Sequence, residues 1–136
     1  MTINKSNKEN DSKRRILLVD DEADIREVFK EEFLSIGWEV YEASNGLEAI
    51  ELFNKTPMDV ILSDVRMPKS TGIDLLTKIR AIHPTVPMVF LVSGFTDLTA
   101  EQAKKSGANR LFNKPFNLSE IMDIIVKEST GLASQV

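Results

Sequence analysis

The sequence predicts a doubly wound α/β fold, in which a parallel sheet carries helices on both faces. Short apolar runs alternate with amphipathic stretches, and three of the runs are almost continuous in Val, Ile and Leu. Strands covered on both faces have this composition, and strands joined by crossover helices make a parallel sheet. The predicted strands are 15–19, 39–43, 60–63, 87–92 and 110–113, and the predicted helices are 24–36, 46–54, 72–82, 98–106 and 117–130.

The predicted helices carry both periodicity and end signals. Gly37 and Gly107 follow the first and fourth helices as C-terminal stops. Thr99 and Gln102 predict a capping box for the fourth helix, and Asn117 predicts a cap for the fifth. Apolar residues recur at helical spacing in the first helix (Ile25, Val28, Phe29, Phe33, Ile36) and in the last (Leu118, Ile121, Met122, Ile125, Val126).

Length and composition restrict the protein class. A chain of 136 residues is enough for one domain, here predicted at 14–130, with a flexible polar tail at 1–13 and a C-terminal tail at 131–136. The net charge of -4 argues against a general nucleic-acid binder, and the absence of cysteine excludes disulfides and thiolate metal sites. No apolar run is long enough to span a bilayer, and the polar N-terminus does not resemble a secretory signal. We expect a cytoplasmic protein.

Polar side chains follow four of the five predicted strands. In an open parallel sheet, ligands bind beyond the carboxyl ends of the strands, so these side chains are expected to meet. They are Asp20 and Asp21 after the first strand, Asp64 after the third, Ser93 after the fourth and Lys114 after the fifth. The sequence therefore predicts three carboxylates, a hydroxyl and an ammonium group at one edge of the sheet.

The clustered carboxylates require compensating positive charge. Two carboxylates about 5 Å apart repel by roughly 3 kcal/mol at an effective dielectric constant near 20. Lys114 can neutralise one charge, and a divalent cation can neutralise two more. Because the donors are oxygens, with no His or Cys nearby, Mg²⁺ is the expected ion and Mn²⁺ is possible.

Four motifs give the chain a specific resemblance. LLVDDE, DVRMPKSTG, VSG and NKPF occur in this order, each at the end of a predicted strand. Together they resemble the receiver domain of two-component response regulators over about residues 14–130. The resemblance implies the strand order 2-1-3-4-5 and a stand-alone phospho-acceptor domain that signals through changed protein contacts.

The resemblance also implies a role for each residue at the acidic edge. Asp64 would accept a phosphoryl group from a phosphohistidine. Asp21 would bind Mg²⁺ directly, together with Asp64 and the backbone carbonyl of Arg66, and Asp20 would act through a metal-bound water. Lys114 would pair with the phosphoryl oxygens.

Further implied roles concern the surrounding turns. Ser93 would hydrogen-bond a phosphoryl oxygen. Pro68 and Gly72 would shape the loop after Asp64. Pro115 would follow a cis peptide bond that aims the preceding lysine.

Other positions are implied to adjust the response. Arg66 and Phe95 would affect the lifetime of the phosphoryl group. The family usually has an aromatic residue three positions before the lysine, where this chain has Leu111, and Phe112 would point to the opposite face of the sheet. We therefore expect the signal to travel through Ser93 and the loop holding Gly94 and Phe95, without exchange of an aromatic ring.

The expected partners are a sensor histidine kinase or a histidine phosphotransferase. A downstream protein would bind the face formed by helix 98–106, strand 110–113 and helix 117–130. Two alternatives remain: an adaptor of the same fold that is not phosphorylated, and a Mg²⁺-dependent phosphohydrolase that forms an aspartyl phosphate. The second usually has D-x-D at the first strand, where this chain has Asp20-Asp21-Glu22, and it usually carries a cap insertion.

Three other polar or aromatic residues are interpreted without a functional role. Glu22 is expected to be a solvated residue near the start of the first helix. His83 is expected to be exposed at the end of the third helix, and Trp38 is expected to contribute packing before the second strand.

Overall fold

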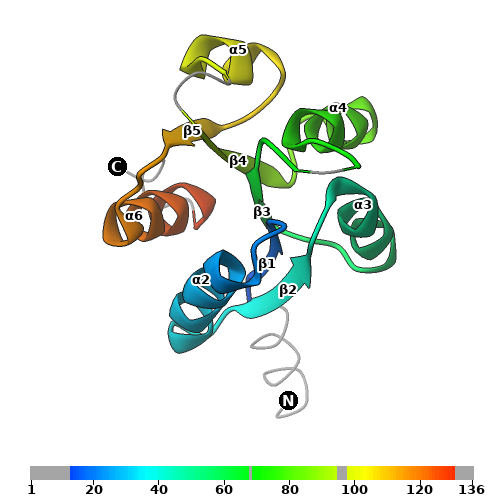
Figure 1. Ribbon diagram of the computed structural model, residues 1–136. Coiled ribbons are helices and arrows are strands. Elements are labelled where there is room, and N and C mark those ends of the chain that lie inside the picture. Colours follow the sequence, from blue (N-terminus) through cyan, green and yellow to red (C-terminus); the bar gives the residue numbers. More distant parts are fainter. Residues whose placement is uncertain (1–12, 68, 95–97, 131–136) are drawn as a thin grey trace.

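Five parallel strands form one sheet between two layers of helices (Figure 1). The computed structural model describes residues 13–67, 69–94 and 98–130. The strands are β1 (Arg15–Val19), β2 (Glu39–Ala43), β3 (Val60–Asp64), β4 (Met88–Ser93) and β5 (Arg110–Asn113), in the order β2-β1-β3-β4-β5. The helices are α2 (Ala23–Ser35), α3 (Gly46–Lys55), α4 (Gly72–Ile82), α5 (Ala100–Lys105) and α6 (Leu118–Ser129). The predicted fold class and strand order are confirmed.

The two faces of the sheet have separate cores. Figure 1 shows α2 and α6 on one face and α3, α4 and α5 on the other. Ile16 and Leu18 of β1 pack with the first pair of helices, whereas Leu17 and Val19 pack with the second group. Successive strand residues point to opposite faces, so a strand between two helical layers needs apolar residues at every position. This explains the continuous apolar run of β1.

The predicted helix ends are confirmed at four positions. Thr99 and Gln102 form the capping box of α5, and the side chain of Asn117 accepts from the backbone of Glu120 to cap α6. Gly37 and Gly107 have φ values of 89° and 108°, which lie in the left-handed region that favours glycine.

Several boundaries and one apolar face differ from prediction. In α2 only Phe29 and Phe33 are buried, while Val28 and Ile36 are 44% and 48% exposed. The apolar stripe is narrower than predicted because Ile36 lies beyond the last helical residue and Val28 lies about 100° around the helix from Phe29. Helix α5 is shorter than predicted because Thr99 caps the helix and does not join it.

The capping residues of two helices were not predicted from the sequence. The side chain of Asn45 accepts a hydrogen bond from Glu48 N at the start of α3. Thr71 and Asp74 form a second capping box at the start of α4. Both caps stand at the edge where the strands end, so they anchor the loops that border the site.

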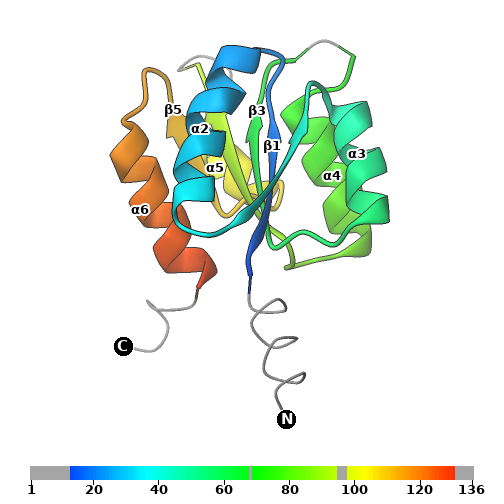
Figure 2. The same ribbon diagram turned by 90° about the horizontal axis from the view of Figure 1, so that it is seen from below.

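Figure 2 shows the strands running in one direction, with all their carboxyl ends at the top edge. Helices α2, α3, α4 and α6 begin at this edge and run back toward the opposite one. The predicted N-terminal and C-terminal tails lie outside the described residues, apart from Lys13. Among the described residues, no helix is long and apolar enough to cross a membrane.

Candidate functional site

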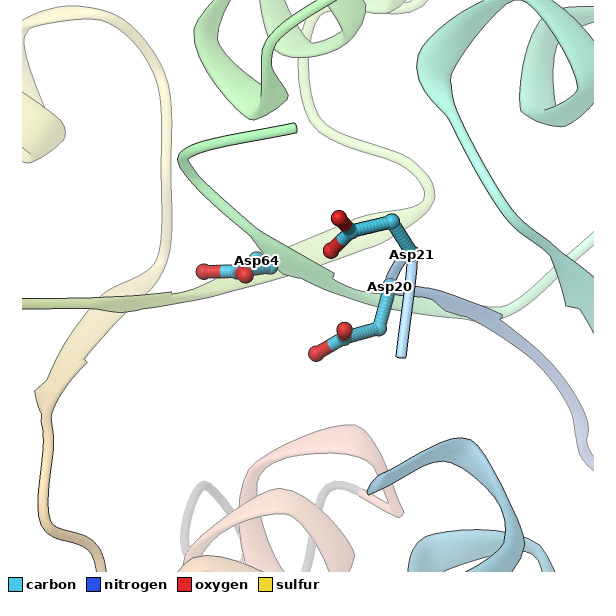
Figure 3. Close-up of side chains that lie close together, drawn as sticks. All are labelled: Asp20, Asp21 and Asp64. Atoms are coloured by element: carbon cyan, nitrogen blue, oxygen red, sulfur yellow. The ribbon is translucent and has the colours of Figure 1, made fainter. Parts of the chain in front are cut away.

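Three carboxylates meet where β1 and β3 end. The two strands are neighbours in the centre of the sheet, with Val19 paired to Ser63, so Asp20 and Asp21 emerge beside Asp64. One carboxylate oxygen from each of the three residues lies within 4.8 Å of the others. Figure 3 shows the three side chains gathered at the strand ends. The order of the chain reverses here, because β2 lies on one side of β1 and β3 on the other.

Asp20 is held by its own turn and by the edge strand. Its Oδ1 accepts a hydrogen bond of 2.8 Å from the backbone N–H of Glu22, and its own N–H donates to the carbonyl of Ala43. Burial raises the pKa of the Asp20 carboxyl from 3.8 to about 6, opposed by the Glu22 N–H and increased by the nearby charge of Asp64. The raised pKa shows that protein groups alone do not fully compensate the charge of an ionised Asp20 carboxylate.

Asp64 is held by Lys114, which follows the edge strand β5. The Nζ of Lys114 lies 3.2 Å from Asp64 Oδ2, and Lys114 N donates to the carbonyl of Ser93 at the end of β4. The peptide bond between Lys114 and Pro115 is cis, which the family resemblance implies. Burial raises the pKa of the Asp64 carboxyl, and the charge and hydrogen bond of Lys114 oppose this rise.

Ser93 lies at the same edge. Asp64 pairs with Val92 of β4, so Ser93 follows one residue beyond the partner of Asp64. The Ser93 side chain is fully buried, and its Oγ donates to the carbonyl of Gly94 at 2.8 Å. Strand order thus brings the predicted hydroxyl to the edge that also carries the carboxylates and the lysine.

The acidic cluster fits a hard divalent cation. Its donors are carboxylate oxygens from three residues, two of them buried, and they face one another closely enough to share one ion. Burial raises the pKa of Asp20 and Asp64, which means that the ionised forms lack full compensation from the protein. A cation bound there would supply the missing charge and open coordination positions.

The loop after Asp64 is packed tightly against the strand end. A Cβ on Gly72 would overlap the carbonyl oxygen of Asp64, so only glycine fits beside this strand end. Lys69 has a positive φ of 70°, and Arg66 is exposed near the cluster. Pro68 and Phe95, which the resemblance assigned to the turn and to phosphoryl lifetime, lie outside the described residues.

Leu111 and Phe112 point to opposite faces, as predicted. Leu111 packs against the core of α3, α4 and α5, whereas Phe112 is buried in the core of α2 and α6. The ring of Phe112 stacks on Phe90 with a centroid separation of 6.2 Å. Neither residue belongs to the acidic cluster, and the position of Leu111 places it beside α5.

The residues interpreted as non-functional behave as expected. Glu22 is exposed at the start of α2 and makes no side-chain cap. His83 is exposed at the C-terminal end of α4, where its ring makes an edge contact with Phe53. Trp38 is buried and packs against Phe33.

The sequence of this chain matches a known family over most of its length. Residues 16–126 match the model of the response regulator receiver domain. The chain belongs to this family. Its members act in two-component signalling, and the receiver domain is a signalling module.

Two relatives and one solved structure illustrate the similarity. The chain is 33% identical over 114 residues to sporulation initiation phosphotransferase F of Bacillus subtilis, covering 83% of this chain and 91% of that protein. It is 38% identical to regulatory protein AtoC of Escherichia coli, covering 88% of this chain but only 26% of that protein. The response regulator TrrA of Thermotoga maritima, solved in complex with Mg²⁺-BeF, is 31% identical with a TM-score of 0.75, covering 84% and 97%.

One residue at the site escaped the sequence analysis. Arg26 of α2 donates from Nη1 to the carbonyl oxygen of Asp20 and from Nε to Glu42 of β2. The acidic motif ends before this residue, and no local spacing rule relates a helical arginine to a strand-end carbonyl six residues earlier. The contact forms because α2 packs beside β2, and this packing could not be inferred from the local sequence.

Proposed function

We propose that this receiver domain accepts a phosphoryl group on Asp64, with Mg²⁺ bound by the neighbouring carboxylates. The observation that carries the proposal is the convergence of Asp20, Asp21 and Asp64 within 4.8 Å, with Lys114 at 3.2 Å from Asp64. Phosphoryl transfer depends mainly on positioning and on neutralising charge, and this cluster offers both. The structure of TrrA with Mg²⁺-BeF supports the proposal, because beryllofluoride mimics a phosphoryl group.

The proposed transfer forms one bond and breaks one. A carboxylate oxygen of Asp64 bonds to phosphorus while the P–N bond of a phosphohistidine breaks, and the electron pair stays on the imidazole nitrogen. Mg²⁺, when bound, neutralises charge on the phosphoryl oxygens. We assign direct metal ligation to Asp21, Asp64 and the carbonyl of Arg66, and a water-mediated contact to Asp20.

Two protein groups would act on the phosphoryl oxygens. Lys114 would pair with an oxygen of a phosphoryl group on Asp64, and its present contact with the Asp64 carboxylate supports this role. Ser93 Oγ at the end of β4 would donate to a second oxygen after leaving the carbonyl of Gly94. We further propose that Arg66 and Phe95 affect how long the phosphoryl group persists.

The proposed partners follow from this chemistry. A sensor histidine kinase or a histidine phosphotransferase would supply the phosphoryl group in the cytoplasm. A downstream protein would bind the face of α5, β5 and α6, which includes Leu111.

We propose residues 14–130 as the receiver domain. This domain would transfer the phosphoryl group to its own Asp64 and lose it slowly.

A small-molecule donor tests the proposal directly. Acetyl phosphate with Mg²⁺ is expected to add one base-labile phosphoryl group, measured by intact mass, and omission of Mg²⁺ should abolish the addition. Asp64→Asn should prevent labelling, while Asp59→Asn, at the opposite end of β3, serves as the matched control. Labelling of Asp64→Asn at the wild-type level would refute the assignment.

A further inference from the structure

An ion pair next to the acidic cluster ties α2 to the edge strand β2. The Nε of Arg26 lies 3.0 Å from Oε1 of Glu42, and the Nζ of Lys30 lies 3.3 Å from Oε2 of the same carboxylate. The Arg26 side chain is only 17% exposed. Burial raises the pKa of Glu42, but the hydrogen bonds from Arg26 and Lys30 outweigh it, so this pKa lies below its ordinary value. Glu42 therefore remains ionised and holds the guanidinium in place.

The other arm of the same guanidinium reaches the acidic cluster. Arg26 Nη1 donates to the carbonyl oxygen of Asp20 at 2.5 Å. The N–H of Asp20 donates to the carbonyl of Ala43, which follows Glu42 in β2. Both backbone polar groups of Asp20 are thus fixed to adjacent residues of the edge strand, one directly and one through Arg26.

The carbonyl that Arg26 holds belongs to the peptide bond between Asp20 and Asp21. A peptide unit is planar, so fixing its oxygen also fixes the direction of the Asp21 N–H and the position of the Asp21 Cα. Asp21 is exposed at the start of the turn that leads into α2. Its carboxylate contributes one of the three converging oxygens, and the orientation of this peptide sets the point from which the Asp21 side chain extends toward Asp64.

We propose that Arg26, held by Glu42, is a positioning residue that orients the Asp20–Asp21 peptide and thereby sets the divalent-cation affinity of the site. The inference rests on the proposed function, because it assumes that the three carboxylates bind Mg²⁺. An arginine suits the role because its planar fork donates to two acceptors on different segments. A lysine ammonium also has several donors, but they radiate from one atom and lack the fixed, spaced geometry of the guanidinium fork.

The competing interpretation is that the ion pair only stabilises the packing of α2 on β2. Arg26→Met separates the two, because methionine preserves an unbranched apolar stem and removes both donors. The positioning role predicts that the Mg²⁺ dissociation constant, measured by isothermal titration calorimetry, rises about tenfold, as is typical when an outer-shell partner of a metal site is lost. Saturating Mg²⁺ should then restore the rate of phosphorylation by acetyl phosphate to within about twofold of wild type, since the change affects binding and not transfer.

A second ion pair on β2 provides the control. Arg15 of β1 and Glu39 of β2 lie 3.3 Å apart between Nε and Oε1, but at the amino ends of the strands, away from the acidic cluster. Arg15→Met should leave the Mg²⁺ dissociation constant unchanged. Glu42→Gln and Arg26→Lys should each give a smaller rise than Arg26→Met, and combining Glu42→Gln with Arg26→Met should add little.

The outcomes separate the inference from the proposed function. If wild-type protein binds no Mg²⁺, the proposed function fails and the inference fails with it. If wild type binds Mg²⁺ but Arg26→Met does so with the same affinity, or if Arg15→Met weakens binding equally, only the positioning role is overturned. Should Arg26→Met fail to fold, an unchanged affinity in both Glu42→Gln and Arg26→Lys overturns it.

Discussion

Asp20 and Asp64 stand at the ends of neighbouring strands and are almost equally buried, with 7% and 6% exposure, yet they are stabilised differently. The carboxylate of Asp20 accepts from the N–H of Glu22, two residues away. The carboxylate of Asp64 faces the ammonium of Lys114, fifty residues away. One acid therefore depends on its own turn, and the other on the packing of β3, β4 and β5.

This difference has consequences for charge. The N–H of Glu22, helped by a smaller effect of the Lys114 charge, offsets only part of the effect of burial on Asp20, and the pKa of this carboxyl remains near 6. A full positive charge from Lys114 opposes the rise at Asp64. The two carboxyls therefore differ in the source of their compensation: a backbone N–H is the main one at Asp20, and the lysine is the main one at Asp64.

Removing the lysine should produce the largest effect. Lys114→Met deprives Asp64 of its cation and the phosphoryl oxygens of a donor, and loss of such a group typically slows a reaction by about 10²–10³-fold. We expect that decrease in the rate of labelling by acetyl phosphate at saturating Mg²⁺. Lys55→Met, at the end of α3 away from the site, is the control. A Lys114→Met rate within tenfold of wild type would argue against direct pairing with the phosphoryl group.

The pH dependence of the free energy of unfolding should reflect the raised pKa of Asp20. Its folded pKa is raised, so its contribution to stability is fully present below the unfolded pKa of 3.8 and is lost as the pH rises through about 6. The shift corresponds to about 3 kcal/mol of unfolding free energy. In EDTA, urea denaturation of wild type should show this loss between about pH 4 and pH 7. Asp20→Asn should flatten the dependence, because its amide oxygen still accepts from Glu22, whereas Asp123→Asn should not; equal pH profiles for Asp20→Asn and wild type would contradict the assignment.

Magnesium should stabilise the protein by a smaller amount. Linkage gives about 1.4 kcal/mol at roughly ten times the dissociation constant. Thermal melts at neutral pH, with and without millimolar Mg²⁺, measure this gain. Asp21→Asn should lose it, while Glu22→Gln, which alters the adjacent exposed acid, should keep it. A full response in Asp21→Asn would show that this carboxylate is not a ligand.

The smallest expected change is a conformational shift at the ends of β4 and β5. On binding beryllofluoride with Mg²⁺, the amides of Ser93 and Gly94 should shift while the ring of Phe112 stays stacked on Phe90. Leu111 is smaller than an aromatic residue and has no hydroxyl to exchange between partners. Nuclear magnetic resonance of the backbone amides and aromatic rings measures both regions. Movement of the Phe112 ring with no change at Gly94 would exclude this route.

Much of the fold could be predicted because local patterns record the final environment. The continuous apolar run of β1 predicted coverage on both faces, and Thr99, Asn117, Gly37 and Gly107 each predicted a helix end that the structure contains. The pattern of α2 was less informative, since Val28 and Ile36 are apolar but exposed. Apolar periodicity identifies a helix without specifying how wide a stripe its neighbours cover.

The polar residues that follow four of the strands could be read from the sequence, and the motifs grouped Asp20, Asp21, Asp64 and Lys114. The contacts that hold these groups became known only from the folded protein. The contact of Lys114 with Asp64 spans fifty residues, the fit of Gly72 against the Asp64 carbonyl depends on a folded loop, and the link from Arg26 to Glu42 requires α2 to lie beside β2. Such contacts join segments whose separation in the chain carries no periodic signal, so their geometry is set by the packing of the sheet and its helices.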